Sequence, residues 1–215
     1  MQKDLSNYRK SYGKGELSEA SIENNPIVQF QKWFNEVEES NGVEEANAMT
    51  VSTIGLDGFP KNRVVLMKKI TQEGFVFYTN YNSEKGKALA KNSDICLSFF
   101  WPNLERQVII QGKAEKIAAN LSDTYFKSRP LGSQLGALVS KQSKVVASRE
   151  LLETRLKQLE KEYAEKEVSR PAHWGGYLVK PIAIEFWQGR PNRLHDRIRY
   201  TLQENFNWKI ERLQP

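Results

Sequence analysis

Residues that build disulfides and metal centres are scarce in this sequence. Among its 215 residues there is one cysteine, Cys96, and there are two histidines, His173 and His195. A single cysteine excludes an intrachain disulfide framework and a cysteine-based metal site. With two histidines in the whole chain, a zinc or non-haem iron centre is not expected either.

Long apolar runs are missing as well. No stretch approaches the length that spans a membrane, and the polar, charged N-terminus lacks the apolar core of a secretion signal. We therefore expect a soluble, cytoplasmic protein without a membrane partner. The glycine-rich turn of dinucleotide-binding folds is also absent, which argues against a Rossmann-type flavoprotein.

What the sequence does contain is a mild excess of positive charge, with a net charge of +6 and a pI near 9.3. The basic residues are scattered among acidic ones, so a nucleic-acid partner is possible but not indicated, and none is predicted. Small phosphorylated ligands explain the excess equally well, because each phosphate needs two or three cationic or hydroxyl donors.

The hydrophobic periodicity predicts a mostly β fold with flanking helices. Residues 1–22 show no periodicity and predict a mobile arm, and 23–215 are predicted to form a single domain. Helices are predicted at Pro26–Glu39, Asn80–Asn92, 120–139 with a break at Pro130–Gly132, and Ser148–Glu167. Strands are predicted at Ala48–Ile54, Arg63–Ile70, Gly74–Thr79, Asp94–Trp101, Arg106–Ile117, around Ile184–Phe186 and Ile198–Tyr200, and at Trp208–Leu213. Short strands joined by hairpin turns favour a closed antiparallel barrel with helices outside.

The segment 185–200 concentrates the chemistry of the chain. Gly189 and Pro191 are turn residues between two predicted strands. Arg193, His195 and Arg197 are then predicted to alternate onto one face of an extended segment. Such a row either binds an anion or forms a solvated basic strand, and the pattern alone leaves both open.

Two further groups of residues suit phosphate binding. Ser83 can cap a helix whose first turn carries Lys85. Tyr125 and Arg129 lie four residues apart on a predicted helix face, and Ser133 can cap the helix that follows. Each group could equally belong to an ordinary capped surface helix.

Seven motifs, in order, resemble those of the pyridoxine/pyridoxamine 5′-phosphate oxidase family. They are Arg63-Val-Val-Leu-Met-Lys68, Phe77-Tyr-Thr79, Glu105-Arg-Gln107, Tyr125-Phe-Lys-Ser-Arg-Pro130, Ser140-Lys-Gln-Ser143, His173-Trp-Gly-Gly176, and Trp187-Gln-Gly with Arg193-Leu-His-Asp-Arg197. The resemblance extends from about Arg9 to Pro215. It implies an FMN-binding split β-barrel that works as a homodimer with FMN at the subunit interface.

The resemblance also implies the reaction and the residues that serve it. Pyridoxine 5′-phosphate and pyridoxamine 5′-phosphate would be oxidised to pyridoxal 5′-phosphate by hydride transfer to FMN, with O2 as the final acceptor and H2O2 as the product. The implied FMN contacts are Arg63, Val64, Val65, Leu66, Met67, Lys68, Tyr78, Thr79, Lys85, Gln107, Gln142, Ser143, Trp187 and Arg197. The implied substrate contacts are Arg9, Tyr12, Lys68, Tyr125, Arg129, Ser133, Arg193 and His195, and the last two are the implied catalytic residues. The segment around Arg9 and Tyr12 resembles a lid that folds over the active site.

Three points complicate this reading. Arg63 and Lys68 have opposite strand parity, so either Arg63 reaches the ligand from the strand end or one of the two faces solvent. Gln107 either meets the flavin or lies exposed at a sheet edge. Glu84 stands where the family usually has an arginine, so Lys85, Arg63 and the helix end would have to hold the FMN phosphate, or Lys87 would compensate.

Other functions remain open at this stage. A non-catalytic flavin- or pyridoxal-phosphate-binding barrel would keep the cofactor residues without turnover. A nucleic-acid-binding barrel would use the same basic and aromatic residues for backbone contacts and base stacking. A related enzyme on the same fold would oxidise another substrate.

Overall fold

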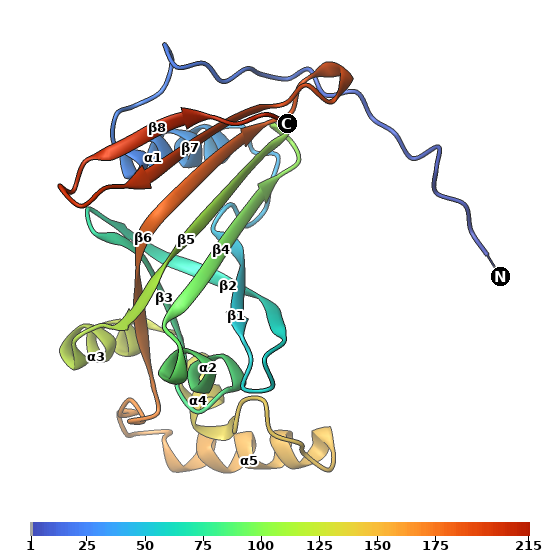
Figure 1. Ribbon diagram of the computed structural model, residues 1–215. Coiled ribbons are helices and arrows are strands. Elements are labelled where there is room, and N and C mark those ends of the chain that lie inside the picture. The colour runs from blue at the N-terminus through green and yellow to red at the C-terminus, as the bar shows by residue number, and fades with distance from the viewer. Residues whose placement is uncertain (1) are drawn as a thin grey trace. The chain divides into compact units, whose positions relative to one another are not determined.

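A computed structural model describes residues 2–215, and within them eight strands form one sheet (Figure 1). The strands are β1 (Ala48–Ile54), β2 (Pro60–Thr71), β3 (Gly74–Asn80), β4 (Asp94–Trp101), β5 (Arg106–Lys116), β6 (Trp174–Gln188), β7 (Asp196–Leu202) and β8 (Trp208–Arg212). The helices are α1 (Pro26–Glu39), α2 (Glu84–Lys91), α3 (Ala119–Ser128), α4 (Leu131–Val139) and α5 (Arg149–Glu162), with a 3-10 turn η1 (Pro191–Arg193).

The strand order closes most of the sheet on itself. It runs β3-β2-β1-β4-β5-β6-β7-β8, and an additional antiparallel pairing joins β3 to β6 from Phe75↔Val179 to Asn80↔Trp174. The first six strands therefore form a closed antiparallel barrel, which removes exposed edges from most of the sheet. This confirms the predicted fold class.

The chain divides into two compact units. The first comprises the chain up to Met49, Leu97–Gln111 and Pro181–Pro215. Its core forms around α1, which begins at Pro26 after the cap Asn25, whose side chain accepts a hydrogen bond from the Ile27 amide at 2.8 Å. The apolar side chains Ile27, Phe30, Trp33, Phe34 and Val37 of this helix are buried, and its ring contacts include Phe30 with Phe99 at 5.0 Å.

The second unit comprises Thr50–Cys96 and Gly112–Lys180. Here α3, α4 and α5 share a small core, to which they contribute Phe126, Leu135 and Leu159, and Trp174 of β6 joins it. In Figure 1, α4 and α5 lie next to each other within this unit. Because this core is small, Leu151 and Leu152 of α5 remain 57% and 38% exposed.

Two helices are shorter than the sequence predicts. The helix expected from Asn80 begins at Glu84, because Ser83 is its N-cap and accepts a hydrogen bond from the Gly86 amide at 3.2 Å. The helix expected to reach Glu167 ends at Glu162, since Tyr163 has already left helical geometry with φ −106° and ψ 16°. The strand predicted around Ile184–Phe186 is longer than expected, because β6 already begins at Trp174. The remaining predicted elements are confirmed within a few residues.

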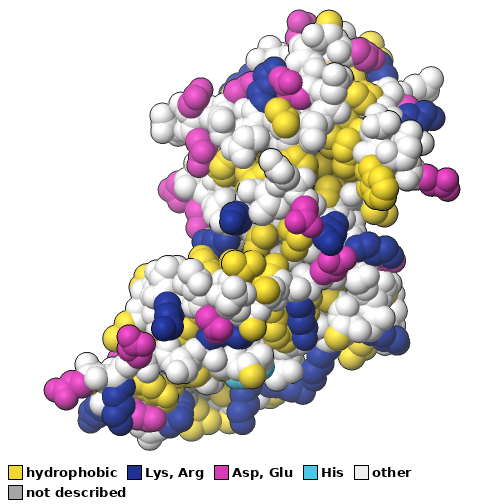
Figure 2. Space-filling model, turned by 90° about the vertical axis from the view of Figure 1, so that its left-hand side faces the viewer, with side chains coloured by type: hydrophobic (Ala, Val, Ile, Leu, Met, Phe, Trp, Pro, Cys, Tyr) yellow, Lys and Arg dark blue, Asp and Glu magenta, His cyan; other side chains and the backbone are white. Residues whose placement is uncertain are grey.

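The surface carries mixed charge. Figure 2 shows one face, on which lysine and arginine side chains lie among aspartate and glutamate, with apolar side chains between them. This pattern differs from the continuous basic stripe of many nucleic-acid-binding proteins. Within the part of the chain that is described, no helix has the length and apolar character that crossing a bilayer requires.

Candidate active site

The second unit contains a pocket of about 470 Å³, a size typical of small-molecule sites. It is bounded by β2, β3, α2, α3, α4, the loop after α4 and the start of β6. The predicted site residues that line it are Val64, Val65, Leu66, Lys68, Tyr78, Thr79, Lys85, Tyr125, Arg129, Ser133 and Gln142. Tertiary structure thus gathers residues that span almost eighty positions of sequence.

One wall of the pocket is a stack of aromatic rings. The rings of Tyr78 and Tyr125 lie 3.9 Å apart at 21°, and Tyr125 and Trp174 are nearly parallel at 9°. Because β3, α3 and β6 each contribute one ring, the stack depends on the packing of all three elements. A flat wall of this kind suits an aromatic ligand.

Arg129 lies against this wall with part of its donor capacity unused. Its guanidinium carbon is 4.6 Å from the centroid of the Trp174 ring, and its buried Nη1 has no hydrogen-bond partner among the described residues. Burial lowers the pKa of this guanidinium. A buried, unpaired cationic donor is costly unless an anion binds it, so the position fits a phosphate or carboxylate.

The local backbone around Arg129 differs from the prediction. Arg129 is not on the helix face of Tyr125 but is the first residue beyond α3, with φ −74° and ψ 149°. The physical reason is Pro130, which disfavours helical geometry in the residue before it. Ser133 does not cap α4 either, because Pro130 occupies the cap and Ser133 lies in the first turn.

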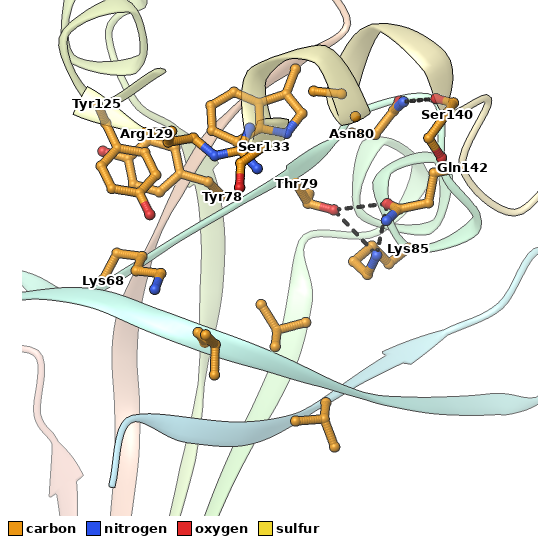
Figure 3. A pocket seen from close by; sticks show the side chains of 16 residues that line it. Lys68, Tyr78, Thr79, Asn80, Lys85, Tyr125, Arg129, Ser133, Ser140 and Gln142 are labelled. Carbon is orange, nitrogen blue, oxygen red and sulfur yellow. Dashed lines mark hydrogen bonds between the residues drawn. The ribbon is translucent and has the colours of Figure 1, made fainter. Parts of the chain in front are cut away.

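The polar residues of the pocket form two separate groups (Figure 3). Lys68, Tyr125, Arg129 and Ser133 lie toward one end, and Thr79, Lys85 and Gln142 lie toward the other. The amino group of Lys85 is 3.2 Å from Thr79 Oγ1 and 3.1 Å from Gln142 Oε1. The pocket therefore offers a cationic site at each end.

The environment of Lys85 favours an anionic ligand. Burial, together with the positive charge of Arg63, lowers its pKa to about 8. Among the described residues, its hydrogen-bond partners are the neutral oxygens of Thr79 and Gln142, which do not balance its charge. An anion beside it would both neutralise the amino group and raise its pKa.

Arg63 is held beside this end rather than inside the pocket. Unlike Lys68, it does not line the pocket, and its Nη1 is 2.8 Å from Thr53 Oγ1 and 2.8 Å from Lys61 O. It is half-buried, so it does not simply face solvent. Met67, on the same face as Arg63, is buried and does not line the pocket.

Glu84 is engaged away from the pocket lining. Its carboxylate is 3.7 Å from the Lys61 amino group, and its amide donates to Ser143 Oγ at 3.2 Å. Ser143 has a left-handed φ of 69° and borders a neighbouring hollow together with Lys87. Side-chain hydroxyls thus take up the Glu84 and Gly86 amides, so these amides are not free donors for a phosphate.

The first unit contains a second pocket, formed where the N-terminal arm meets the loop before β7. Its predicted site residues are Arg9, Tyr12, Arg193 and His195. The prediction that Arg193 lies in an extended row is wrong: η1 places Arg193 in a turn with φ 62°, and β7 begins only at Asp196. The turn arises because Pro191 opens it and Asn192 also adopts a left-handed φ of 58°.

Arg197 and Trp187 form a cross-strand pair in this unit. Arg197 makes a bidentate ion pair with Glu185, at 2.8 Å and 3.1 Å, so a carboxylate already balances its charge. Trp187 instead packs near Tyr12, with ring centroids 5.8 Å apart. Gln107 lies on β5, between β4 and β6, so it is not at a sheet edge.

Glu105 anchors the arm and is the main functional candidate that the sequence did not single out. It is 2% exposed, and its carboxylate accepts hydrogen bonds from the Gly13 and Lys14 amides at 2.8 Å and 3.0 Å. Burial alone would raise the pKa of this carboxyl, but these bonds and the charge of Lys10 bring it below the ordinary value. A left-handed φ of 57° at a non-glycine residue is the other sign of a special role.

Two residues near these pockets were also missed. Trp174 lies within the quoted His-Trp-Gly-Gly motif, but its contact with Arg129 depends on α3 packing against β6. Gly189 is the last residue of the Trp187-Gln-Gly motif and was considered only as a turn residue, and a Cβ there would lie 2.8 Å from the Tyr12 ring. Neither contact leaves a signal in the sequence.

Comparisons with known families match almost the whole chain. The profile described as "Pyridoxamine 5'-phosphate oxidase" matches residues 36–163, and "Pyridoxine 5'-phosphate oxidase C-terminal dimerisation region" matches residues 174–215. A pyridoxine/pyridoxamine 5′-phosphate oxidase of Flavobacterium psychrophilum is 68% identical over 213 residues, covering 99% of this chain and 100% of that one. One from a Nostoc species is 49% identical over 215 residues, covering 100% of both.

Solved structures share the fold. PhzG from Burkholderia lata, in complex with tetrahydrophenazine-1-carboxylic acid, has a TM-score of 0.87 at 26% identity and covers 94% of this chain and 100% of that one. A pyridoxamine 5′-phosphate oxidase-related, FMN-binding protein from Nostoc punctiforme has a TM-score of 0.69 at 14% identity, over 86% and 97% of the two chains. The second likeness concerns the fold alone.

Proposed function

Since the chain belongs to the pyridoxamine 5′-phosphate oxidase family, we propose that it oxidises pyridoxine 5′-phosphate and pyridoxamine 5′-phosphate to pyridoxal 5′-phosphate, with FMN as cofactor and O2 as acceptor. This would be the last step of vitamin B6 cofactor synthesis or salvage. One observation carries the proposal: a single pocket has an aromatic wall and a cationic site at each end. A phosphorylated cofactor and a phosphorylated aromatic substrate need those features.

The Lys85 end suits the phosphate of FMN. The desolvated amino group, the Thr79 hydroxyl and the neighbouring charge of Arg63 form a donor set for a phosphate dianion. FMN, when bound, would supply the redox chemistry, taking a hydride from C4′ of the substrate and passing the electrons to O2 to give H2O2. Val64, Val65 and Leu66 would bound its apolar part.

The other end suits the 5′-phosphate of the substrate. Lys68 and Arg129 would supply charge, and the hydroxyls of Tyr125 and Ser133 would supply further donors. These residues would bind a group that does not react, and so would orient the substrate ring. Arg193 would orient C4′ and steady charge on its oxygen or nitrogen, while Arg9 and Tyr12 of the arm would exclude water.

We further propose that the enzyme is a homodimer whose active site draws on both subunits. The dimerisation region, residues 174–215, contains Trp187, Arg193, His195 and Arg197. The region that joins the subunits therefore also carries the proposed reacting groups, and in one subunit it would serve the pocket of the other. A heterodimer of Arg129→Met and Arg193→Ala subunits, purified through two tags, tests this.

If the two groups act across the interface, the heterodimer has one intact site of two. At a substrate concentration well below KM, where both substitutions lower the rate, it then keeps about half of the wild-type activity. If both act within one subunit, each site carries one lesion and activity stays at the level of the single variants. The parent homodimers, purified in the same way, provide the matched controls.

The visible spectrum of the holoprotein tests the function itself. Under anaerobic conditions, adding pyridoxine 5′-phosphate should bleach the flavin band, and admitting air should restore it. A flavin band that the substrate leaves unchanged would favour a non-catalytic binding protein or an enzyme with another substrate. A protein that does not take up FMN would refute the cofactor assignment.

A further inference from the structure

His195 is held by a backbone hydrogen bond that fixes which ring nitrogen carries the proton. The Arg190 amide donates to His195 Nδ1 at 3.1 Å. An amide N–H can only donate, so Nδ1 must present its lone pair, and the neutral ring then carries its proton on Nε2. We propose that His195 donates a hydrogen bond from Nε2–H to the substrate and does not accept a proton from it; the assignment of a substrate rests on the function proposed above.

The Arg190 amide is fixed by the two residues before it and by the side chain of Arg190 itself. The Gly189 amide donates to Glu105 O at 2.8 Å, and the Gln188 side chain donates to Leu104 O at 3.0 Å. The Arg190 guanidinium, in turn, donates to Gly15 O at 2.9 Å. The donor that faces His195 is therefore preorganised by the end of β6 and by the arm.

The ring itself is positioned by aromatic contacts. The centroid of Trp187 lies 4.7 Å from that of His195, and the centroid of Tyr12 lies 5.8 Å from it. His195 is half-buried and lines the same pocket as Arg9 and Arg193. Contacts with other side chains of the protein thus hold the ring in place in the pocket of the first unit.

This arrangement is the reverse of a histidine base. A histidine that takes a proton at Nε2 usually donates from Nδ1–H to a carboxylate or carbonyl, which stabilises the protonated ring. Here Nδ1 accepts, and among residues 2–215 no carboxylate forms an ion pair with His195; the neighbouring Asp196 binds the Leu17 amide and Arg212. His195 would therefore keep its protonation state, and the proton of an oxidised hydroxyl would pass to water.

The tautomer can be measured without substrate. The chain has two histidines, so 15N-histidine labelling of the holoenzyme gives two ring systems, and a His195→Gln variant identifies one of them. A long-range 1H–15N spectrum at neutral pH should show an unprotonated Nδ1 and a protonated Nε2 for His195. A protonated Nδ1 would overturn the proposal, whatever the substrate is.

Two variants test the donor role. Asparagine at 195 offers an oxygen to the Arg190 amide near the position of Nδ1 but has no donor near Nε2. Glutamine reaches the position of Nε2 with an amide donor. We expect His195→Gln to keep kcat/KM for pyridoxine 5′-phosphate within about 5-fold of wild type, whereas His195→Asn lowers it about 10- to 100-fold.

Any other pattern of kcat/KM in these two variants would exclude the donor role. Equal, large losses in both variants would mean that His195 acts as a base. Wild-type rates in both would mean that His195 only supports the loop. If the wild-type holoenzyme does not turn over pyridoxine 5′-phosphate, the proposed function fails, and the NMR result still decides the tautomer.

Discussion

Replacing Arg129 by methionine separates substrate binding from turnover. The substitution keeps an unbranched apolar stem and removes the charge and all of the donors of the side chain. Because Arg129 would hold the non-reacting phosphate, the loss should appear in KM, with kcat changed only a few-fold. FMN binding should not change, since the proposed cofactor phosphate site lies at the other end of the pocket, around Lys85.

The expected magnitude follows from the contacts of this side chain. A hydrogen bond to a charged group contributes about 1.5–3 kcal/mol, so losing one from the buried Nη1 corresponds to an increase in KM of about 10- to 150-fold. Stability should change little. Removing an unpaired buried donor stabilises the ligand-free protein, while losing the contact with the Trp174 ring costs about 0.5–2 kcal/mol in the opposite direction.

Steady-state oxidation of pyridoxine 5′-phosphate at a fixed O2 concentration measures both constants. Arg155→Met is the matched control, because this arginine is exposed on α5 and bonds only to Gln158 among the described residues. An unchanged KM in Arg129→Met would remove Arg129 from the substrate site. Loss of FMN instead would show that the two phosphate sites have been interchanged.

Three further predictions concern other residues. Arg193→Ala should lower kcat by about 100-fold or more while the flavin absorbance of the purified protein is retained, and unchanged turnover would exclude Arg193 from the reaction. Glu105→Gln should speed hydrogen exchange over residues 8–17, because it removes the negative charge that strengthens the two backbone bonds to Oε2 and attracts Lys10. The wild type should respond in the same way to acid, since the lowered pKa of Glu105 means that arm docking is lost as the pH falls through it. Exchange that is insensitive to both would refute the anchor. The pKa of Lys85 is about 8, against an ordinary 10.5, so the ligand-free protein should become more stable as the pH rises between these values. FMN binding should weaken by up to tenfold per pH unit above 8, because Lys85 loses its charge there. Lys85→Arg should abolish this pH dependence, and a flat wild-type profile would exclude a role for Lys85 in binding FMN.

Local pattern was sufficient for the elements and for the residue types at the site. The period of two in Ala48–Ile54 and the proline at the start of Pro26–Glu39 each determine a backbone within a few residues. The same local rules fail where a neighbour overrides them. Pro130 takes Arg129 off its helix, and the turn at Pro191 takes Arg193 out of the predicted row, because proline restricts both its own φ and the conformation of the residue before it.

What the sequence by itself determined, then, is the fold class, the family and the chemical character of the candidate site. Only the tertiary structure decided which residues meet. The stacking of Trp174 against Arg129 and the anchoring of the arm by Glu105 join segments 45 and about 90 residues apart, through contacts that have no local periodicity. The tautomer of His195 also depends on the tertiary structure. It is set by the backbone N–H of Arg190, and since every residue except proline carries such a group, only the fold determines which one points at the ring.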